Sequence, residues 1–246
     1  KQKMNNNWNN ENEILDHTGQ AMAVPKTFVS NVMVLMSLGL LISGVLAYLF
    51  GNSAELFGLL YNLETGGRTA LGWIVMLAPL GLVFGLGAAY RKFSSNAMIL
   101  MFVVFSALMG MSLSSIFMVY SAGSISLTFF IAAGMFGTMA VAGYTTNTDL
   151  TKMGYLLYMG LIGIIIASVV NWFIGSSSMD YIISFIGVLV FTGLTAYDMQ
   201  KIKQLGMQID HQSEDGRKMA VMGALSLYLD FINLFLFLLR FFGNRN

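Results

Sequence analysis

Residues 219–242, MAVMGALSLYLDFINLFLFLLRFF, form an apolar run with a single acid, Asp230, near its middle. A helix rises about 1.5 Å per residue, and about 20 apolar residues cross a hydrocarbon core of roughly 30 Å. The run is therefore long enough to span a membrane as a helix. Asp230 would lie roughly 16 Å beyond Met219, about half-way across the bilayer.

The composition of the whole chain indicates the same class of protein. Of its 246 residues, 56% are hydrophobic and only 10% are charged, whereas soluble domains carry about 25% charged residues. The chain has no cysteine, which excludes disulfides, thiol catalysis and cysteine-based metal sites. Its two histidines, His17 and His211, lie in polar segments and are not available inside a span. We therefore expect a multi-pass membrane protein.

Six further apolar segments are long enough to cross a bilayer, which gives seven expected spans. The runs are long and continuous rather than alternating, which favours helices over strands. The predicted fold class is thus an all-α membrane protein with seven transmembrane helices. The expected spans are residues 27–50, 69–90, 96–119, 126–147, 153–174, 181–200 and 219–242.

The segment before the first span, residues 1–26, is polar and rich in asparagine. It lacks the apolar core of a cleavable signal peptide. We expect a mostly disordered, flexible cytoplasmic tail, followed by one seven-helix transmembrane domain over residues 27–246. The first span would then double as an uncleaved insertion signal.

The distribution of lysine and arginine predicts the orientation, because short cytoplasmic loops carry an excess of these residues. Three arginines fall on one side, Arg68, Arg240 and Arg245, if the last helix crosses fully. The other ten cations share the opposite side, which should be cytoplasmic together with the N-terminus. They are Lys1, Lys3, Lys26, Arg91, Lys92, Lys152, Lys201, Lys203, Arg217 and Lys218. The arginines near the C-terminus leave open that the seventh helix is re-entrant or crosses only partly.

Small residues recur along the expected spans, where they would permit close approach between helices in lipid. This pattern predicts packing and says nothing about chemistry. The positions that we single out are Gly81, Gly85, Gly134, Gly137, Gly160, Gly163 and Gly187.

Of the twelve acidic residues, only Asp198 and Asp230 fall inside expected spans. An aspartate near a bilayer centre costs about 2.5–3.5 kcal/mol on insertion scales, so each needs a partner, water or a function. Asp230 shares one helix face with Ser226 at i−4 and Asn233 at i+3. Thr195 lies one turn before Asp198 on the same face of its helix. The expected polar lining near the two acids is Thr195, Ser226 and Asn233.

The sixth and seventh spans are consecutive, so Asp198 and Asp230 could approach one another in the cytoplasmic half of the membrane. Two carboxylates in a low-dielectric site are expected to hold one proton between them, and losing it leaves two charges that repel. Such a pair could open a cation pathway, and oxygen ligands suit Ca²⁺. The alternative is purely structural: Asp198 would pair with Lys201 or Arg91, and Asp230 with neighbouring polar groups. Arg91 itself is either an interface anchor or a counter-ion that latches Asp198.

The sequence contains none of the G-x-S-x-G, H-E-x-x-H, P-loop or EF-hand motifs. The dipeptide YD at 197–198 matches half of an intramembrane aspartyl protease signature, but GxGD is absent. We therefore predict that the protein is not an enzyme. The basic loops are short and serve orientation, so nucleic acid is not an expected partner.

Three stretches carry a family resemblance: TGLTAYDMQKIK (192–203), ALSLYLDFINLFLFLLRFFG (224–243) and, more weakly, MLAPLGLVFGL (76–86). Together they resemble the Bax inhibitor family, also called transmembrane Bax inhibitor motif proteins, in a bacterial form. The resemblance implies six helices wrapped around a central C-terminal seventh. It also implies a bacterial inner (cell) membrane location.

The resemblance further implies a pH-sensitive calcium leak channel without a cofactor, whose interaction partners are the lipid bilayer, Ca²⁺ and protons. Asp198 and Asp230 would be its pH sensor and pore gate and would bind Ca²⁺ transiently. Arg91, or else Lys92, would be the latch. The alternative function is a non-transporting regulator that binds a membrane-anchored AAA protease. A proton-coupled transporter is disfavoured, because the sequence shows no clear inverted repeat or pair of broken helices.

Overall fold

The computed structural model describes residues 8–62 and 65–244, and for residues 8–25 and 89 it describes the backbone alone. Its elements are helices, with one isolated bridge between Tyr61 and Arg68, and the described residues contain no strand. In chain order the helices are α1 (Trp8–Asn52), α2 (Ala54–Leu60), α3 (Ala70–Ala89), α4 (Ser95–Leu113), α5 (Ile116–Val119), α6 (Ala122–Thr145), α7 (Thr151–Ile174), α8 (Ser177–Gln208) and α9 (Glu214–Phe242).

Seven segments of these helices are long and apolar enough to cross a membrane, which confirms the predicted fold class. They are Lys26–Asn52, Ala70–Ala88, Ser95–Val119, Ala122–Thr145, Thr151–Ile174, Ser177–Gln208 and Glu214–Phe242. The last two helices extend well beyond their expected bounds. The segment between them, expected as a loop over residues 201–218, is mostly helical and turns within residues 209–213. Hydropathy detects only the part of a helix in hydrocarbon, whereas a helix continues into water where its residues favour it.

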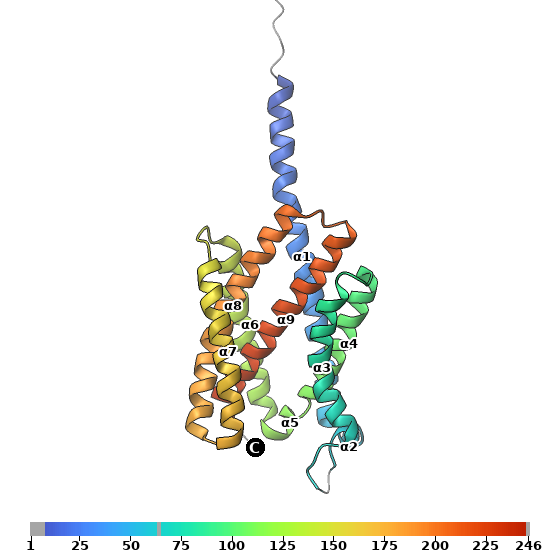
Figure 1. The fold of residues 1–246 in the computed structure, drawn as a ribbon, viewed down its shortest axis with the longest axis vertical. Helices are drawn as coiled ribbons and strands as arrows, with labels where there is room; N and C mark the ends of the chain where they lie inside the picture. Colours follow the sequence, from blue (N-terminus) through green and yellow to red (C-terminus); the bar gives the residue numbers. More distant parts are fainter. Residues whose placement is uncertain (1–7, 63–64, 245–246) are drawn as a thin grey trace, which may run out of the picture.

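The N-terminal segment also differs from the expectation. The backbone is helical from Trp8, so α1 continues the first span far beyond Lys26, and Figure 1 shows it projecting from the bundle. A helix that is already formed in the membrane adds each further residue without a new nucleation step, which favours such an extension. Residues 1–7 of the expected disordered tail lie outside the described residues.

The seventh span crosses the bundle completely and is not re-entrant. It begins beside α4, where Ser95 donates its N–H to Glu214 Oε1 at 2.5 Å. It ends at the opposite face, where Asn244 donates its N–H to Ser124 Oγ at 3.0 Å and Arg240 lies 3.9 Å from Asp180. The last described residue, Asn244, and the projecting part of α1 therefore lie at opposite ends of the bundle (Figure 1).

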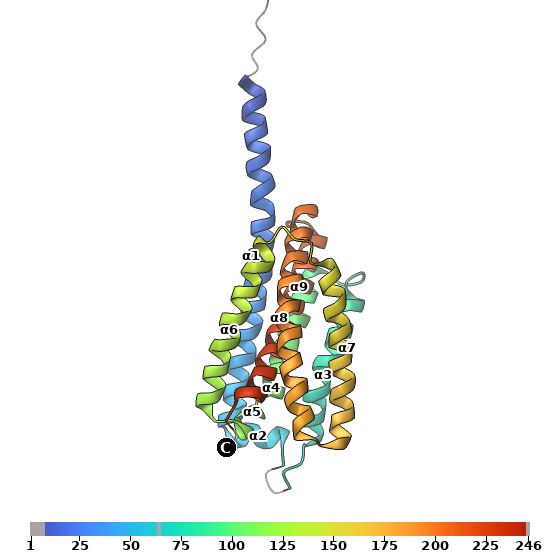
Figure 2. The ribbon, with the colours of Figure 1, turned by 90° about the vertical axis from the view of Figure 1, so that its left-hand side faces the viewer.

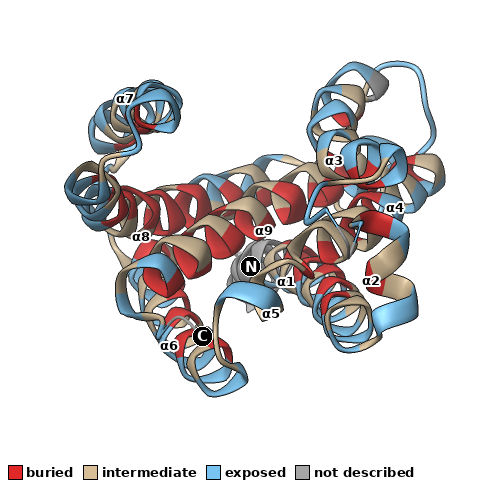
Figure 3. Cartoon of the chain, turned by 90° about the horizontal axis from the view of Figure 1, so that it is seen from below, coloured by how far each residue is buried: buried red, intermediate tan, exposed pale blue. Residues whose placement is uncertain are grey.

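The centre of the bundle is formed by α8 and α9, which pack antiparallel (Figures 1 and 2). The α9 helix is the most buried span and also contacts α1, α4 and α6. The α3 helix packs on α4, and α7 packs on α8 at the edge of the molecule. Figure 3 shows buried residues concentrated along α8 and α9. This arrangement is consistent with a central C-terminal helix.

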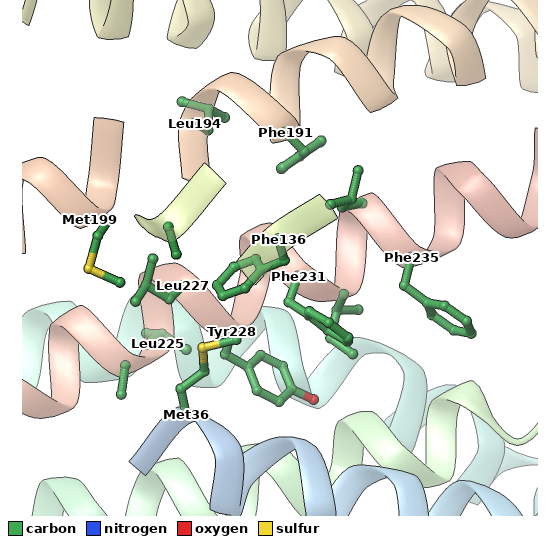
Figure 4. Packing of buried hydrophobic residues seen from close by; sticks show 14 of the residues in the cluster. Met36, Phe136, Phe191, Leu194, Met199, Leu225, Leu227, Tyr228, Phe231 and Phe235 are labelled. Atoms are coloured by element: carbon green, nitrogen blue, oxygen red, sulfur yellow. The ribbon is translucent and has the colours of Figure 1, made fainter. Parts of the chain in front are cut away.

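Aromatic and aliphatic side chains from several helices interlock on α9. Phe136 of α6 meets Phe231 edge to face with ring centroids 5.6 Å apart, and Met36 of α1 and Phe191 of α8 belong to the same cluster (Figure 4). Rings in this orientation place a positive edge against a negative face. The cluster therefore fixes α1, α6 and α8 relative to α9.

The glycines that let helix backbones approach closely are mostly not those that the sequence analysis singled out for packing. A Cβ at Gly143 of α6 would collide with the backbone of Ala196 in α8, and one at Gly110 would lie 2.5 Å from Ser43 O. Of the expected packing positions, Gly187, Gly160 and Gly85 do meet neighbouring side chains, those of Phe237, Val190 and Met101. A Cβ at Gly81, Gly134, Gly137 or Gly163 would meet nothing within 4 Å.

Candidate functional site

The antiparallel packing of α8 and α9 brings together residues that are far apart in each helix. Asp198 lies in the last third of α8, and Ser226 of α9 faces it and donates a hydrogen bond to its Oδ2. Asp230 lies one turn further along α9, about 6 Å deeper in the bundle. Both aspartates are buried, with 4% and 5% of their surfaces exposed.

The second oxygen of Asp198 accepts a hydrogen bond from α7. The hydroxyl of Tyr158 donates to Asp198 Oδ1 at 3.3 Å, and the Tyr158 ring meets Tyr197 edge to face at 6.0 Å. Tyr158 is 39% exposed at the outer surface of the bundle. Sequence reasoning missed this residue, because Tyr155 occurs one turn earlier in the same span and no spacing rule distinguishes the two.

The start of α7 is tied to α8, which places Tyr158. Gln200 of α8 donates to Thr148 O at 2.8 Å and accepts from the N–H of Leu150 at 2.9 Å. Asp149, in the same turn, accepts from both the N–H and the hydroxyl of Thr151. These two hydrogen bonds favour the ionised carboxylate and hold the pKa of Asp149 below its usual value.

Asp230 differs from Asp198 in its surroundings. Its Oδ2 is buried without a hydrogen-bond partner among the described residues, although Asp198 lies within electrostatic range. No hydrogen bond joins the two carboxylates in residues 8–62 and 65–244. Since an unpaired buried charge is costly, this environment favours a neutral, protonated group or a bound cation. The structure therefore brings the two predicted residues near one another and leaves one oxygen unsatisfied.

The other predicted neighbours have different roles. Thr195 is fully buried, and its hydroxyl donates to Phe191 O of its own helix at 2.8 Å. The amide of Asn233 likewise donates to Leu229 O at 2.8 Å. In the described chain, Ser226 is the one member of the expected polar lining that donates a hydrogen bond to an aspartate.

The structure does not bring Arg91 to Asp198. Arg91 and its fallback Lys92 are both exposed at the turn after α3. The ion pairs of the described residues join Arg217 to Glu214 and Arg240 to Asp180, so neither Arg91 nor Lys201 pairs with Asp198. An exposed arginine at this position fits the role of an interface anchor. No contact of the described residues supports its role as a latch for Asp198.

A pocket of about 300 Å³ between α8 and α9 gives access to Asp198. Asp198 and Ser226 form part of its wall, and it extends toward the exposed Lys201 at the end of the bundle that carries most of the cations. Asp230 does not line it. One carboxylate therefore faces a pocket while the other lies deeper in the protein.

The site offers few ligands for a metal. The described residues contain no group of three or more His, Cys, Asp or Glu side chains that could hold an ion. Calcium sites usually supply six to eight oxygens. Two carboxylates and a serine hydroxyl therefore suit a hydrated cation in transit better than a resident one.

Comparison with known proteins identifies the family. The family model described as "Inhibitor of apoptosis-promoting Bax1" matches residues 25–246, which include both aspartates. The chain belongs to the Bax inhibitor family. It is 46% identical over 231 residues to the inner membrane protein YbhL of Escherichia coli K12, covering 94% of this chain and 97% of that protein.

Two further relatives extend the family resemblance across bacteria. An uncharacterized protein of Borreliella burgdorferi is 48% identical over 227 residues, covering 92% of this chain and 95% of the relative. An uncharacterized membrane protein of Streptococcus pyogenes serotype M1 is 36% identical over 221 residues, covering 89% and 93%. Together with the seven apolar helices, the likeness to YbhL makes this Bax inhibitor family member a multi-pass inner-membrane protein.

Proposed function

We propose that this protein is a pH-sensitive calcium (cation) leak channel that is gated by protonation of Asp198 and Asp230. The observation that supports the proposal is the asymmetry of the pair: Asp198 lines a pocket, whereas Asp230 is sealed with one oxygen unpaired. No cofactor is needed, and Ca²⁺ is the permeant ion.

The gate follows from the electrostatics of two buried acids. With one proton between them the pair carries a single charge, and the tight packing of α8 on α9 is tolerated. Loss of that proton leaves two like charges in a low-dielectric site, where their repulsion is much stronger than in water. The helices separate at Asp230, and the two carboxylates attract a cation from the pocket at Asp198.

The orientation belongs to the same proposal. The end of the bundle that carries Lys26, Arg91, Lys152 and Lys203 faces the cytoplasm, in line with the positive-inside rule. The pocket at Asp198 then opens toward the cytoplasm, so the pair responds to cytoplasmic pH.

Flux measured in liposomes tests this function. Purified protein is reconstituted with an internal Ca²⁺ dye, and flux is followed over a series of pH values, because the two acids titrate as a pair. Flux should rise with pH in the natural protein. Asp198→Asn and Asp230→Asn should each abolish that rise, because neither variant can reach the doubly charged state.

The matched control is Asp180→Asn, which removes a carboxylate from α8 at the opposite end of the bundle. Its pH dependence should equal that of the natural protein. Absence of flux in the natural protein, or an unaltered pH dependence in both pair variants, contradicts the channel.

A second candidate function is a non-transporting regulator that binds a membrane-anchored AAA protease. The observation that favours it is the part of α1 that projects from the bundle (Figure 1), since residues before 25 also lie outside the family match. Deleting residues 1–24 should then abolish co-purification with such a protease. Asp198→Asn and Asp230→Asn should leave that co-purification unchanged.

A further inference from the structure

A long apolar groove follows the membrane-facing side of the bundle between α1 and α6. It consists of three adjoining pockets of about 720, 370 and 410 Å³. The first adjoins the second at Leu40 and Phe129 and the third at Met33 and Gly137, so the three are continuous. The groove is separate from the pocket at Asp198.

The groove is closed at one end. Its floor there consists of Phe231 and Phe235 of α9. The short helix α5 lies between the ends of α1 and α6, as Figure 3 shows, and Phe117 of α5 packs edge to face on Tyr48 of α1 at 6.2 Å. A helix about 10 Å wide that crossed the whole membrane would have to pass this obstruction. The groove therefore suits a ligand that enters from the other end.

The other end of the groove carries a lysine. Lys26 lines the third pocket and begins the first membrane span. A lysine at the end of a span is expected near the lipid headgroups. No described residue forms an ion pair with it. The neighbouring Lys203 is engaged, because it donates to Tyr144 O at 2.7 Å and lies 5.2 Å from the centre of the Tyr144 ring. Lys26 thus provides a positive charge at the mouth of an apolar groove.

We propose that this groove binds an anionic phospholipid, with its acyl chains along α1 and α6 and its phosphate at Lys26. The groove runs roughly 33 Å along α1 from Lys26 to Tyr48, about the thickness of the hydrocarbon core, so the chains of one lipid would occupy the half of the groove that begins at Lys26. An amphiphile with one negative end matches a groove that is apolar, blocked at one end and positive at the other. The proposal is independent of the channel function, because the groove shares no residue with the pocket at Asp198.

Native mass spectrometry of the purified full-length protein tests this site. The protein is titrated with palmitoyl-oleoyl phosphatidylglycerol, or with phosphatidylcholine of the same chains. Phosphatidylglycerol should bind more tightly. Lys26→Gln should weaken its binding by about fivefold, the contribution of one lysine beside an anionic headgroup, and should weaken that of phosphatidylcholine less, because the choline cation compensates the phosphate charge. Lys152→Gln, at the same end of the bundle but on α7, is the matched control.

A second pair of variants tests the groove itself. Gly137→Phe fills it from α6, and Gly134→Phe places the same ring on the same helix outside the pocket lining; a Cβ at either position meets nothing within 4 Å. Gly137→Phe should lose the tightly bound lipid, and Gly134→Phe should retain it. If Gly137→Phe does not fold, Ser37→Leu on the α1 wall, nearer to Lys26, takes its place.

Three outcomes overturn the proposal. Equal binding of the two lipids would show that the headgroup charge does not matter. Equal lipid retention by Gly137→Phe and Gly134→Phe would show that the lipid does not bind in the groove. A change in the number of protein copies in Gly137→Phe, with lipid binding unaltered, assigns the groove to a second copy of the chain.

Discussion

At the scale of single residues, Tyr158 is the group that links the outer helix α7 to the buried acids. Its hydroxyl donates to Asp198 at 3.3 Å, and this stabilises the ionised carboxylate. Tyr158→Phe removes the donor and keeps the ring. If the channel function holds, the carboxylate should retain its proton to higher pH, so the midpoint of flux against pH should move upward by about 0.5–1 unit. Liposome flux measured over a pH series checks this.

Tyr155→Phe on the same helix is the control, because Tyr155 is 73% exposed. A purely structural role for the Tyr158 hydroxyl would lower flux at all pH values and leave the midpoint in place. The titratable groups that interact with Asp198 from neighbouring helices are Tyr158 of α7 and Asp230 of α9, and Lys201 lies near it on α8 itself. Repeating the change in an Asp198→Asn background should give no shift, since the carboxylate is then absent.

Sequence reasoning reached part of this site for a physical reason. A charge inside an apolar run is a local property, and the i, i+4 spacing of Ser226 and Asp230 places both on one helix face, so these residues were predictable together with Asp198. The contact with Tyr158 depends on how α7 leans on α8, which no local pattern encodes. Choosing between an interface anchor and a latch at Arg91 likewise required knowledge of where the α3–α4 turn lies relative to α8.

At the scale of elements, the contact between α6 and α8 depends on the absence of a side chain at Gly143. Gly143→Val should destabilise the protein by about 1–3 kcal/mol or more, because its Cβ would collide with the Ala196 backbone, which cannot rotate away. Gly134→Val on the same helix meets open space and should retain stability. Thermal unfolding in detergent measures both. Equal stability of the two variants contradicts the packing at Gly143.

Helices and their ends were not equally predictable. The number of spans follows from hydropathy, because crossing hydrocarbon demands about 20 apolar residues whatever the neighbours are. The ends of α8 and α9 lie in polar sequence, where capping decides them: Ser213 accepts from the N–H of Gly216 at 3.0 Å and begins α9 before its apolar run. The groove between α1 and α6 was not predictable, since Gly137 is indistinguishable in sequence from a glycine at a helix contact.

At the scale of the whole molecule, the full crossing of α9 determines on which side each end of the chain lies. The chain contains no cysteine, so single cysteines can report sidedness without background. Asn147→Cys, in the exposed turn between α6 and α7, and Asn244→Cys, beyond α9, lie at opposite ends of the bundle.

In intact cells with a permeabilised outer membrane, a membrane-impermeant maleimide should label Asn244→Cys. Asn147→Cys should be labelled only after the inner membrane is opened, because the positive-inside rule places it in the cytoplasm. Labelling of both from the same side contradicts the complete crossing, and labelling in the reverse order preserves the fold but inverts the proposed orientation of the pocket at Asp198.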